Sequence, residues 1–176
     1  STMYETELSI AIKAVKEACL LCSKVQSSIH SAVSKSDRSP VTIADFGAQA
    51  VVGHILDQAF PMVPLVGEED AGALRSNPDL LDKTLAAVHT RLPEMTAEQL
   101  LFAIDRGCHS GGDGRFWTLD PIDGTKGFLR GDQYAVALAL IEDGEVVIGV
   151  LGCPNLPLVL NEPNGPRGSI FAAVLG

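Results

Sequence analysis

Hydrophobic residues in the first third of the chain recur at steps of three and four, the spacing of one face of an α-helix. This pattern predicts a long amphipathic helix over residues 4–32, followed by a polar segment at residues 34–40. A second helix is expected from residue 41 to residue 59, because Pro61 cannot continue helical hydrogen bonding. Its expected apolar face comprises Ala48, Val51, Val52, Ile55, Leu56 and Ala59.

Two further segments have helical periodicity, at residues 78–92 and 96–106. Thr96 is followed three residues later by Gln99, which is the signature of a capping box. The second of these helices is therefore expected to begin at Thr96.

Short apolar runs predict strands. Residues 63–66 and 116–119 are brief and rich in large apolar side chains, which is typical of buried strands. Residues 134–142 and 145–153 flank an Asp-Gly pair, a strong hairpin signal. Two more candidates, residues 158–160 and 169–175, follow. The order of elements predicts an α+β fold, with layered helices packed on a largely antiparallel sheet.

The composition is typical of a globular protein. The chain has 176 residues, 46% of them hydrophobic and 20% charged, which suits one domain with a real core. It shows neither a signal-peptide pattern nor an apolar run of the ~18 residues that span a bilayer. We therefore expect no membrane association and a cytoplasmic protein, although a removed organelle-targeting segment would leave no trace.

The net charge of −9 argues against nucleic-acid binding through a basic surface. It does not argue against a phosphorylated substrate, because bound metal ions can invert the local charge. The four cysteines are too scattered for a disulfide framework. Cys19 and Cys22 have the spacing of a redox motif, but they fall in a helical apolar pattern and are expected to be small packing residues. The histidines share no ligand spacing with each other or with the cysteines.

The most informative segment follows the strand at residues 116–119. Asp120 lies at the expected strand end, and Pro121 should stop the ladder because it has no N–H to donate. Asp123 and the glycine after it form a turn, and Thr125 can begin a helix. Asp-Pro and Asp-Gly pairs are ordinary turn formers, so either pair alone would predict only a turn. Two carboxylates beside a helix start instead suggest a site for Mg²⁺ and phosphate.

Two more acidic positions share this design. Glu68 follows the predicted strand at residues 63–66, and Asp45 lies near the start of a helix. Strand ends at one edge of a sheet can bring such residues into one cleft, where two cations could clamp a phosphate and activate water. The alternative for residues 68–70 is a solvated acidic turn, or anions that favour the next helix start.

These residues carry a resemblance to a known family. Asp45, residues 67–69 and residues 120–125 resemble the three motifs of the inositol monophosphatase superfamily, which are magnesium-dependent, lithium-inhibited phosphomonoesterases. Residues 39–42, 123–131 and 152–155 are similar to the 3′(2′),5′-bisphosphate nucleotidases within it. Relatives that act on inositol monophosphate usually have Asn at the position of Gly127.

The resemblance implies a role for each residue. Two or three Mg²⁺ ions would be held by Glu68, Asp120, the carbonyl of Ile122 and Asp123, with Asp120 bridging two of them. Asp45 and Thr125 would position and deprotonate the attacking water. The amides of Gly124 and Thr125 would bind phosphate. The implied reaction removes the 3′-phosphate of adenosine 3′,5′-bisphosphate, or of 3′-phosphoadenylyl sulfate, without a phosphoenzyme, as part of sulfur assimilation, and Li⁺ would inhibit it.

The chain departs from the family in length. Members usually carry a second half with a Trp-Asp motif that completes the metal site, and most of the nucleoside pocket. Trp117 is the only tryptophan and is followed by threonine, so that motif is absent. Residues 1–176 are thus expected to be one N-terminal metal- and phosphate-binding domain without the C-terminal nucleoside-binding domain, either as a piece of a longer enzyme or as a natural short form.

Two alternatives to the nucleotidase reading stay open. A half-length form could be non-catalytic or regulatory, binding metal or a full-length partner. The chain could also bind a complementary C-terminal half or a second copy of itself. An inositol polyphosphate could also be the substrate, although Lys126 and Gly127 argue mildly against it.

Overall fold

The computed structural model describes residues 3–29, 37–157, 165 and 167–176. The described helices are α1 (Glu5–Ser27), α2 (Ser39–Ala59), α3 (Gly72–Arg75), α4 (Pro78–His89), α5 (Ala97–Asp105) and α6 (Thr125–Arg130). The described strands are β1 (Leu65–Val66), β2 (Arg115–Asp123), β3 (Ala135–Glu142), β4 (Glu145–Pro157) and β5 (Arg167–Val174). None of these helices has the length and hydrophobicity needed to cross a membrane.

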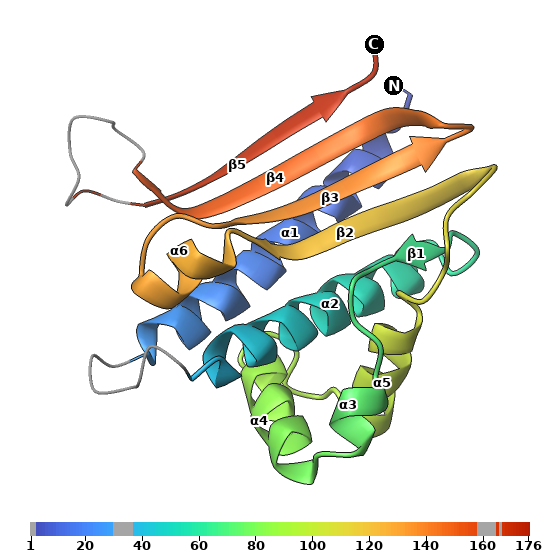
Figure 1. Ribbon diagram of the computed structural model, residues 1–176. Helices are drawn as coiled ribbons and strands as arrows, with labels where there is room; N and C mark the ends of the chain where they lie inside the picture. Colours follow the sequence, from blue (N-terminus) through green and yellow to red (C-terminus); the bar gives the residue numbers. More distant parts are fainter. Residues whose placement is uncertain (1–2, 30–36, 158–164, 166) are drawn as a thin grey trace.

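The strands form one sheet in the order β1-β2-β3-β4-β5. β1 runs parallel to β2, and every other neighbouring pair is antiparallel. Figure 1 shows the strands side by side, with α1 passing behind them and α2 lying below β2 in this view. The fold is therefore the expected α+β arrangement of helices on a largely antiparallel sheet.

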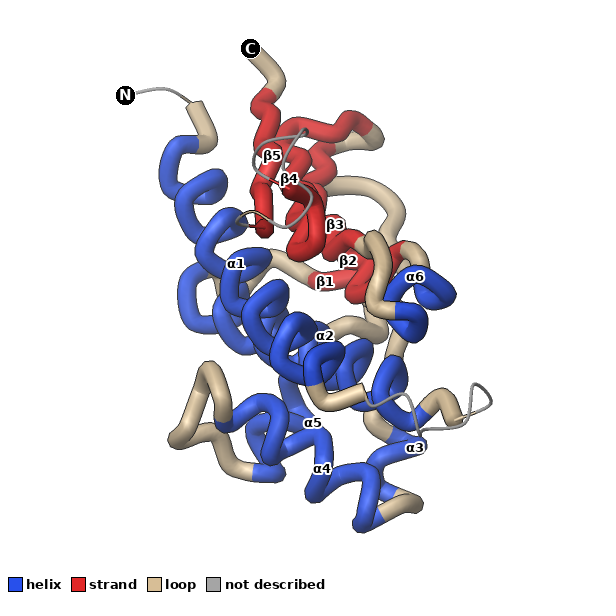
Figure 2. Tube along the Cα trace, turned by 90° about the vertical axis from the view of Figure 1, so that its left-hand side faces the viewer, coloured by secondary structure: helices blue, strands red, loops and turns tan. Residues whose placement is uncertain are grey.

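The helices form two layers on one side of the sheet. α1 packs on α2, β3 and β4, whereas α2 packs on β2 and, on its other side, on α4 and α5. The turned view in Figure 2 shows the strands at the top, α1 and α2 beside them, and α3 to α5 beyond α2. No helix described here covers the other face of the sheet.

The core lies between the sheet and the first helical layer. Its largest fully buried side chains include Trp117, Phe128, Leu21, Leu56 and Leu140. Removing this apolar surface from water is the main stabilising contribution, at about 25 cal/mol per Å². α2 contributes more buried residues than any other helix because it is sandwiched between the sheet and the outer layer.

Most element predictions are confirmed, with shifted ends. α1 ends at Ser27, before the expected residue 32, and residues 30–36 lie outside the described part of the chain. α2 begins two residues earlier than expected because Pro40 is suited to the first turn of a helix, where no N–H is needed. α4 ends at His89, and the short α3 was not predicted. Ala59, expected on the apolar face of α2, is exposed.

The cap and hairpin signals are confirmed. The Thr96 side chain accepts from the Gln99 N–H, and the Gln99 side chain accepts from the Thr96 N–H. Asp143 and Gly144 have φ values of 50° and 82°, the two left-handed conformations of a type I′ hairpin turn. The predicted strand at residues 169–175 corresponds to β5, whereas that at residues 158–160 lies outside the described residues.

The prediction that Pro121 stops the strand is wrong. β2 continues to Asp123, but its register shifts: Asp120 pairs with Ala137 and Asp123 with Ala135. Three steps along β2 thus match two steps along β3, which is a β-bulge. A residue in a bulge needs no ladder hydrogen bond, so the missing N–H of proline is tolerated there.

Candidate functional site

The parallel pairing of β1 and β2 explains how two candidate ligands meet. Leu65 pairs with Trp117 and Val66 with Thr118. Glu68 and Asp120 each lie two residues beyond the last of these pairs, so both strands deliver a carboxylate just past the point where their pairing ends. Since neighbouring parallel strands emerge at one sheet edge, sequence positions 52 residues apart are brought together.

Asp45 faces this edge from α2. The pKa of its carboxyl group is raised to about 7. Burial is the largest cause of this rise, and the charges of Glu69, Glu68 and Asp120 contribute the rest. Arg38, at the start of the same helix, opposes the rise. A carboxyl group that exchanges its proton near neutral pH is suited to act as a general base.

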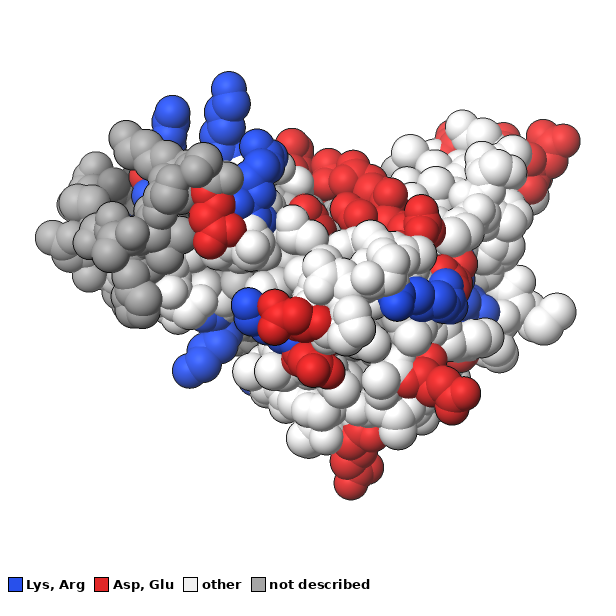
Figure 3. Space-filling model, turned by 60° about the horizontal axis from the view of Figure 1, so that its bottom comes forward, with Lys and Arg blue, Asp and Glu red and all other residues white. Residues whose placement is uncertain are grey.

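The other carboxylates also disturb one another. Burial raises the pKa of Glu68, and the charges of Asp120, Glu69 and Asp123 add to that rise. Burial and Asp123 raise the pKa of Asp120, partly offset by a backbone hydrogen bond from Ile122. The structure therefore brings Asp45, Glu68, Asp120 and Asp123 into one cluster of poorly compensated negative charge. Figure 3 shows acidic side chains gathered in a patch on one face, with Lys and Arg beside it.

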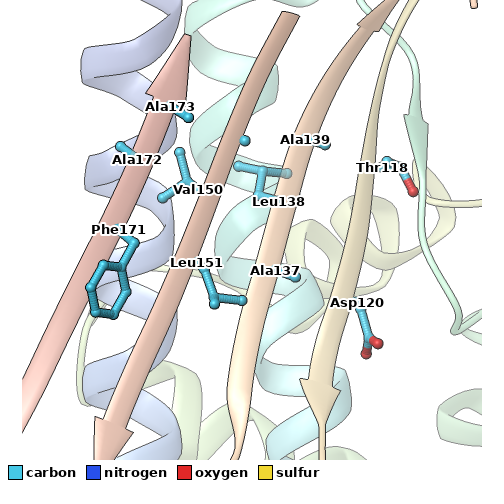
Figure 4. Close-up of a pocket in the computed structure, with 11 residues that line it drawn as sticks. Thr118, Asp120, Ala137, Leu138, Ala139, Val150, Leu151, Phe171, Ala172 and Ala173 are labelled. Atoms are coloured by element: carbon cyan, nitrogen blue, oxygen red, sulfur yellow. The ribbon is translucent and has the colours of Figure 1, made fainter. Parts of the chain in front are cut away.

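Asp120 is the least satisfied member of this cluster. Its Oδ1 atom is buried and has no hydrogen-bond partner. Its side chain lies at the end of a hollow of about 490 Å³ on the open face of the sheet, together with Thr118 of the same strand. Figure 4 shows that the rest of the hollow is apolar, with Ala137, Leu151 and Phe171 along the neighbouring strands. A buried acceptor without a partner is costly unless something else binds it.

The chemistry of this cluster fits hard divalent cations. Its donors are carboxylate oxygens, which Mg²⁺ prefers, and an added positive charge would relieve their mutual repulsion and occupy the free Oδ1 of Asp120. Among the described residues, however, no three His, Cys, Asp or Glu side chains are arranged closely enough to hold a metal ion as they stand. The carboxylates would have to converge on an ion.

α6 places the remaining candidate residues directly after Asp123. Gly124 has φ 98°, a left-handed conformation that favours glycine, and forms the N-cap of this helix. Thr125 follows as its first residue and is partly buried. That Asp45 and Thr125 act on one water molecule stays a prediction.

Gly127 is fixed by packing. A Cβ atom at this position would lie 1.9 Å from the backbone oxygen of Gln133. The loop after α6 therefore closes tightly on the helix, and the N–H of Asp132 donates to the Gly127 carbonyl at 2.7 Å. An Asn side chain could not occupy this geometry without movement of the loop.

Comparison with known proteins identifies the family. The profile of the inositol monophosphatase family matches residues 2–175. The chain belongs to the inositol monophosphatase family.

Its sequence relatives include two proteins named for nucleotidase activity. It is 46% identical over 189 residues to a 3′(2′),5′-bisphosphate nucleotidase of Schizosaccharomyces pombe, covering 97% of this chain and 54% of that protein. It is 47% identical over 195 residues to 3′(2′),5′-bisphosphate nucleotidase 1 of Arabidopsis thaliana, covering 98% and 55%. The chain thus spans about half the length of the curated relatives it matches.

Solved structures show the same fold. An inositol monophosphatase from Zymomonas mobilis matches with a TM-score of 0.55 and 22% identity, over 99% of this chain and 54% of that one. CysQ from Bacteroides thetaiotaomicron, a bacterial member of the family, matches with a TM-score of 0.52 and 21% identity, over 86% and 46%.

The cysteines lie outside the set of candidate site residues, although the charge of Asp45 adds to the raised pKa of Cys22. All four are free, and Cys22 is fully buried in α1. Burial raises the pKa of the Cys19 thiol to about 12 and that of Cys22 well above its usual value. The prediction that both are packing residues of a helix is confirmed by their place in α1, where Cys22 is buried and Cys19 is partly buried.

The sequence reasoning missed Gln49. This residue lies one helical turn after Asp45, and its side chain is 0% exposed. It hydrogen-bonds to the backbone of Glu69. The available signal was a single large polar side chain within the otherwise small and apolar run at residues 47–53 of an expected helix.

Proposed function

We propose that this chain carries the metal- and phosphate-binding half of a Mg²⁺-dependent 3′(2′),5′-bisphosphate nucleotidase. The reaction is hydrolysis of the 3′-phosphate of adenosine 3′,5′-bisphosphate to AMP and phosphate, with 3′-phosphoadenylyl sulfate as a second substrate. The observation that carries the proposal is the meeting of Asp45, Glu68, Asp120 and Asp123 at one sheet edge. The names of the relatives support the choice of nucleotide.

Glu68, Asp120, the backbone carbonyl of Ile122 and Asp123 are the proposed holders of two or three Mg²⁺ ions. When bound, these ions would neutralise the cluster and the phosphate and lower the pKa of a water molecule. The carboxylates of Glu68 and Asp123 are exposed and can reorient toward an ion, whereas Asp120 is partly buried in its strand. The family resemblance implies that Asp120 would be shared between two of the ions.

Asp45 and Thr125 act on the proton of the attacking water. The Asp45 carboxylate, which faces Glu68 and Asp120 from α2, is the proposed acceptor of this proton. The Thr125 hydroxyl can accept from water while donating to a carboxylate, which orients the water. The amides of Gly124 and Thr125, at the start of α6, hold the phosphate for direct in-line attack.

Gly127 supports a nucleotide rather than an inositol phosphate as substrate. The tight contact between this glycine and the Gln133 carbonyl gives α6 and its loop a shape that an Asn side chain would not permit. Inositol polyphosphate remains the alternative substrate, tested beside the nucleotide below. We place the reaction in sulfur assimilation in the cytoplasm, with Li⁺ as an inhibitor.

A partner is expected on the open face of the sheet. On this face Phe171 is 52% exposed and Leu151 is 38% exposed, which is unusual for large apolar side chains on neighbouring strands. This chain covers only about half the length of the two nucleotidase relatives. We propose that a complementary C-terminal half, or failing that a second copy of this chain, covers this face and completes the nucleoside pocket.

The test is phosphate release from adenosine 3′,5′-bisphosphate, with Mg²⁺ and with or without millimolar Li⁺. We expect weak or no release by the 176-residue chain alone and lithium-sensitive release after addition of a complementary C-terminal half from a relative. An inositol polyphosphate run in parallel decides the substrate class. Absence of release from the complemented protein, with every phosphate ester tried, would contradict the proposal.

Asp120→Asn is the matched variant in the complemented protein. It removes the bridging ligand while keeping side-chain size, so we expect loss of turnover of at least about 10³-fold with the fold retained. Near-native turnover in this variant would show that the metal assignment is wrong. A second candidate function, a non-catalytic form that regulates a full-length partner, is favoured if the chain binds such a partner but never supports release.

A further inference from the structure

Gln49 and Thr84 are the two polar side chains that are fully buried within the described residues. The hydroxyl of Thr84 bonds to Leu80 of its own helix, so its role is local. Gln49 instead reaches across the fold from α2 to two segments far away in the sequence. Burying an amide costs free energy unless all its hydrogen bonds are made, so this side chain must be satisfied where it lies.

Both the oxygen and the nitrogen of the Gln49 amide form hydrogen bonds to backbone groups. Its Oε1 accepts from the backbone N–H of Glu69 at 3.0 Å. Its Nε2 donates to the backbone oxygen of Glu69 at 2.7 Å and to that of Ile104 at 2.9 Å. One N–H and two carbonyls require this orientation of the amide, because a flipped amide would place donors against a donor and an acceptor against acceptors.

Two glycines close over the amide. A Cβ atom on Gly67 would lie 2.5 Å from Oε1 of Gln49, and one on Gly107 would lie 2.4 Å from its Nε2. The backbones of these glycines are joined directly, since the N–H of Gly67 donates to the carbonyl of Gly107 at 2.8 Å. The loop after β1 is therefore clamped between the end of α5 and a side chain of α2.

Gln49 connects the two sides of the carboxylate cluster. It lies four residues after Asp45 on α2, and it holds Glu69, the residue directly after Glu68. An α-helical turn brings residues four apart onto the same side of the helix. One side chain thus connects the helix that carries Asp45 to the loop that carries Glu68.

We propose that Gln49 is a positioning residue, which holds Glu68 in register with Asp45 so that the carboxylates can converge on a divalent cation. The inference rests on the proposed metal function of Glu68. Gln49 itself touches neither substrate nor metal and acts only through the backbone of the loop. A side chain without an amide would leave the loop free to move, because Glu69 and Ile104 would lose their buried partners.

The test compares Gln49→Met, which keeps length and removes all three hydrogen bonds, with two controls. Thr84→Val removes the other buried polar group, and Leu140→Ala opens a cavity in β3 while keeping the three hydrogen bonds of Gln49. Hydrogen exchange of the segment at residues 65–72 reports positioning in the metal-free chain. Mn²⁺ binding, followed by electron paramagnetic resonance and calorimetry, reports the effect on a divalent ion.

We expect exchange of the loop amides to accelerate at least about tenfold in Gln49→Met under conditions where both controls leave it unchanged. The Mn²⁺ dissociation constant should rise by about 10- to 100-fold in Gln49→Met and by less than about twofold in the controls. Gln49→Asn keeps the amide on a shorter side chain. Gln49→Asn should show the same changes in weaker form, and it replaces Gln49→Met in the test if the methionine variant does not fold.

The outcomes separate this proposal from the proposed function. Unchanged loop exchange in the Gln49 variants, or an equal loss of Mn²⁺ affinity in Leu140→Ala, would overturn the positioning role. Failure of the unsubstituted chain to bind Mn²⁺ would count against the metal site of the proposed function. In that case the exchange experiment still decides whether Gln49 positions the loop.

Discussion

The two sides of strand β2 differ in their effect on stability. On the helix-covered side, Trp117 is 0% exposed and Leu119 is 3% exposed, and both lie in a continuous apolar core. One residue further, Asp120 places a carboxylate on the open side with a buried, unpartnered oxygen and a raised pKa. The same strand therefore contributes its stabilisation on one side and a destabilising group on the other.

The difference shows where stability and function reside. The core gains free energy from burial, whereas the carboxylate cluster costs free energy until a counter-charge binds. Sites that are strained or repulsive in the free protein are retained when a ligand relieves them. The four variants below test this division, beginning with the largest expected effect.

Trp117→Ala should cause the largest loss. This side chain is fully buried and its ring lies 6.1 Å from that of Phe60, so removing it leaves a cavity in the centre of the core. We expect the free energy of unfolding to fall by about 3–5 kcal/mol, measured by urea denaturation followed by circular dichroism. Trp117→Phe should lose much less. A loss below about 1 kcal/mol for the alanine variant would contradict the placement of the core.

Gly127→Ala should destabilise the junction between core and site. The new Cβ would lie 1.9 Å from the Gln133 oxygen, so α6 or its loop must move. We expect a loss of about 1–3 kcal/mol, the usual cost of overpacking. Gly149→Ala is the control, because nothing lies within 4 Å of a Cβ there. Equal stabilities of the two variants would disprove the close approach.

Asp45→Asn should stabilise the metal-free chain at high pH only. Folding raises the Asp45 pKa from 3.8 to about 7, so the folded state binds a proton more tightly than the unfolded state between these values. Stability from this group is therefore lost as pH rises through that window, and asparagine avoids the loss. The full shift corresponds to about 4 kcal/mol, and solvent screening of a partly exposed carboxylate reduces this to about 1–2 kcal/mol.

The measurement for Asp45→Asn is thermal unfolding in chelator at pH 4 and pH 8. The two proteins should be equally stable at the lower pH, and the variant should be more stable at the higher pH. Saturating Mg²⁺ should remove or reverse the higher stability of the variant, because bound cations attract the ionised Asp45 carboxylate of the unsubstituted chain. An advantage that does not depend on pH would refute the assigned cause.

Arg75→Ala should have the smallest effect. Arg75 and Asp105 form a 2.6 Å ion pair, but their side chains are 53% and 36% exposed. Burial alone would raise the Asp105 pKa, yet the hydrogen bonds from Arg75 and the Ala71 N–H lower it overall. The pair therefore stabilises above the ordinary carboxyl pKa and loses its effect as pH falls through the lowered value.

For this ion pair we expect a loss below about 1 kcal/mol at neutral pH, removed by high salt. Urea denaturation at low and high ionic strength measures it. A loss as large as that of the core variants would show that surface charge, and not the core, dominates stability.

Much of the fold could be predicted from local signals. The capping box at Thr96 and the Asp143–Gly144 hairpin are decided by a few adjacent residues, and both predictions are confirmed. The strand end at Pro121 was predicted wrongly, because whether proline breaks a ladder depends on the register of the neighbouring strand. The short α3 has too few residues to produce a periodic pattern.

The candidate site was predictable only in part. Asp45, Glu68, Asp120 and Asp123 were chosen from motifs, and the structure brings their charges together. Their roles as ligands and base stay predictions. Gln49 could not be assigned a partner from sequence, because the groups it binds at Glu69 and Ile104 are backbone atoms, which every residue possesses.

Most helices and strands, the family motifs and the chemical types of the site residues follow from local spacing and side-chain identity, so they can be predicted from the sequence. The parallel pairing of β1 with β2, which sets Glu68 beside Asp120, follows only from the packing of the whole fold. The tertiary structure also decided that the bulge tolerates Pro121 and that Gln49 clamps the loop after β1. These are pairings between distant segments, which are fixed by how the whole core packs and not by any one stretch of chain.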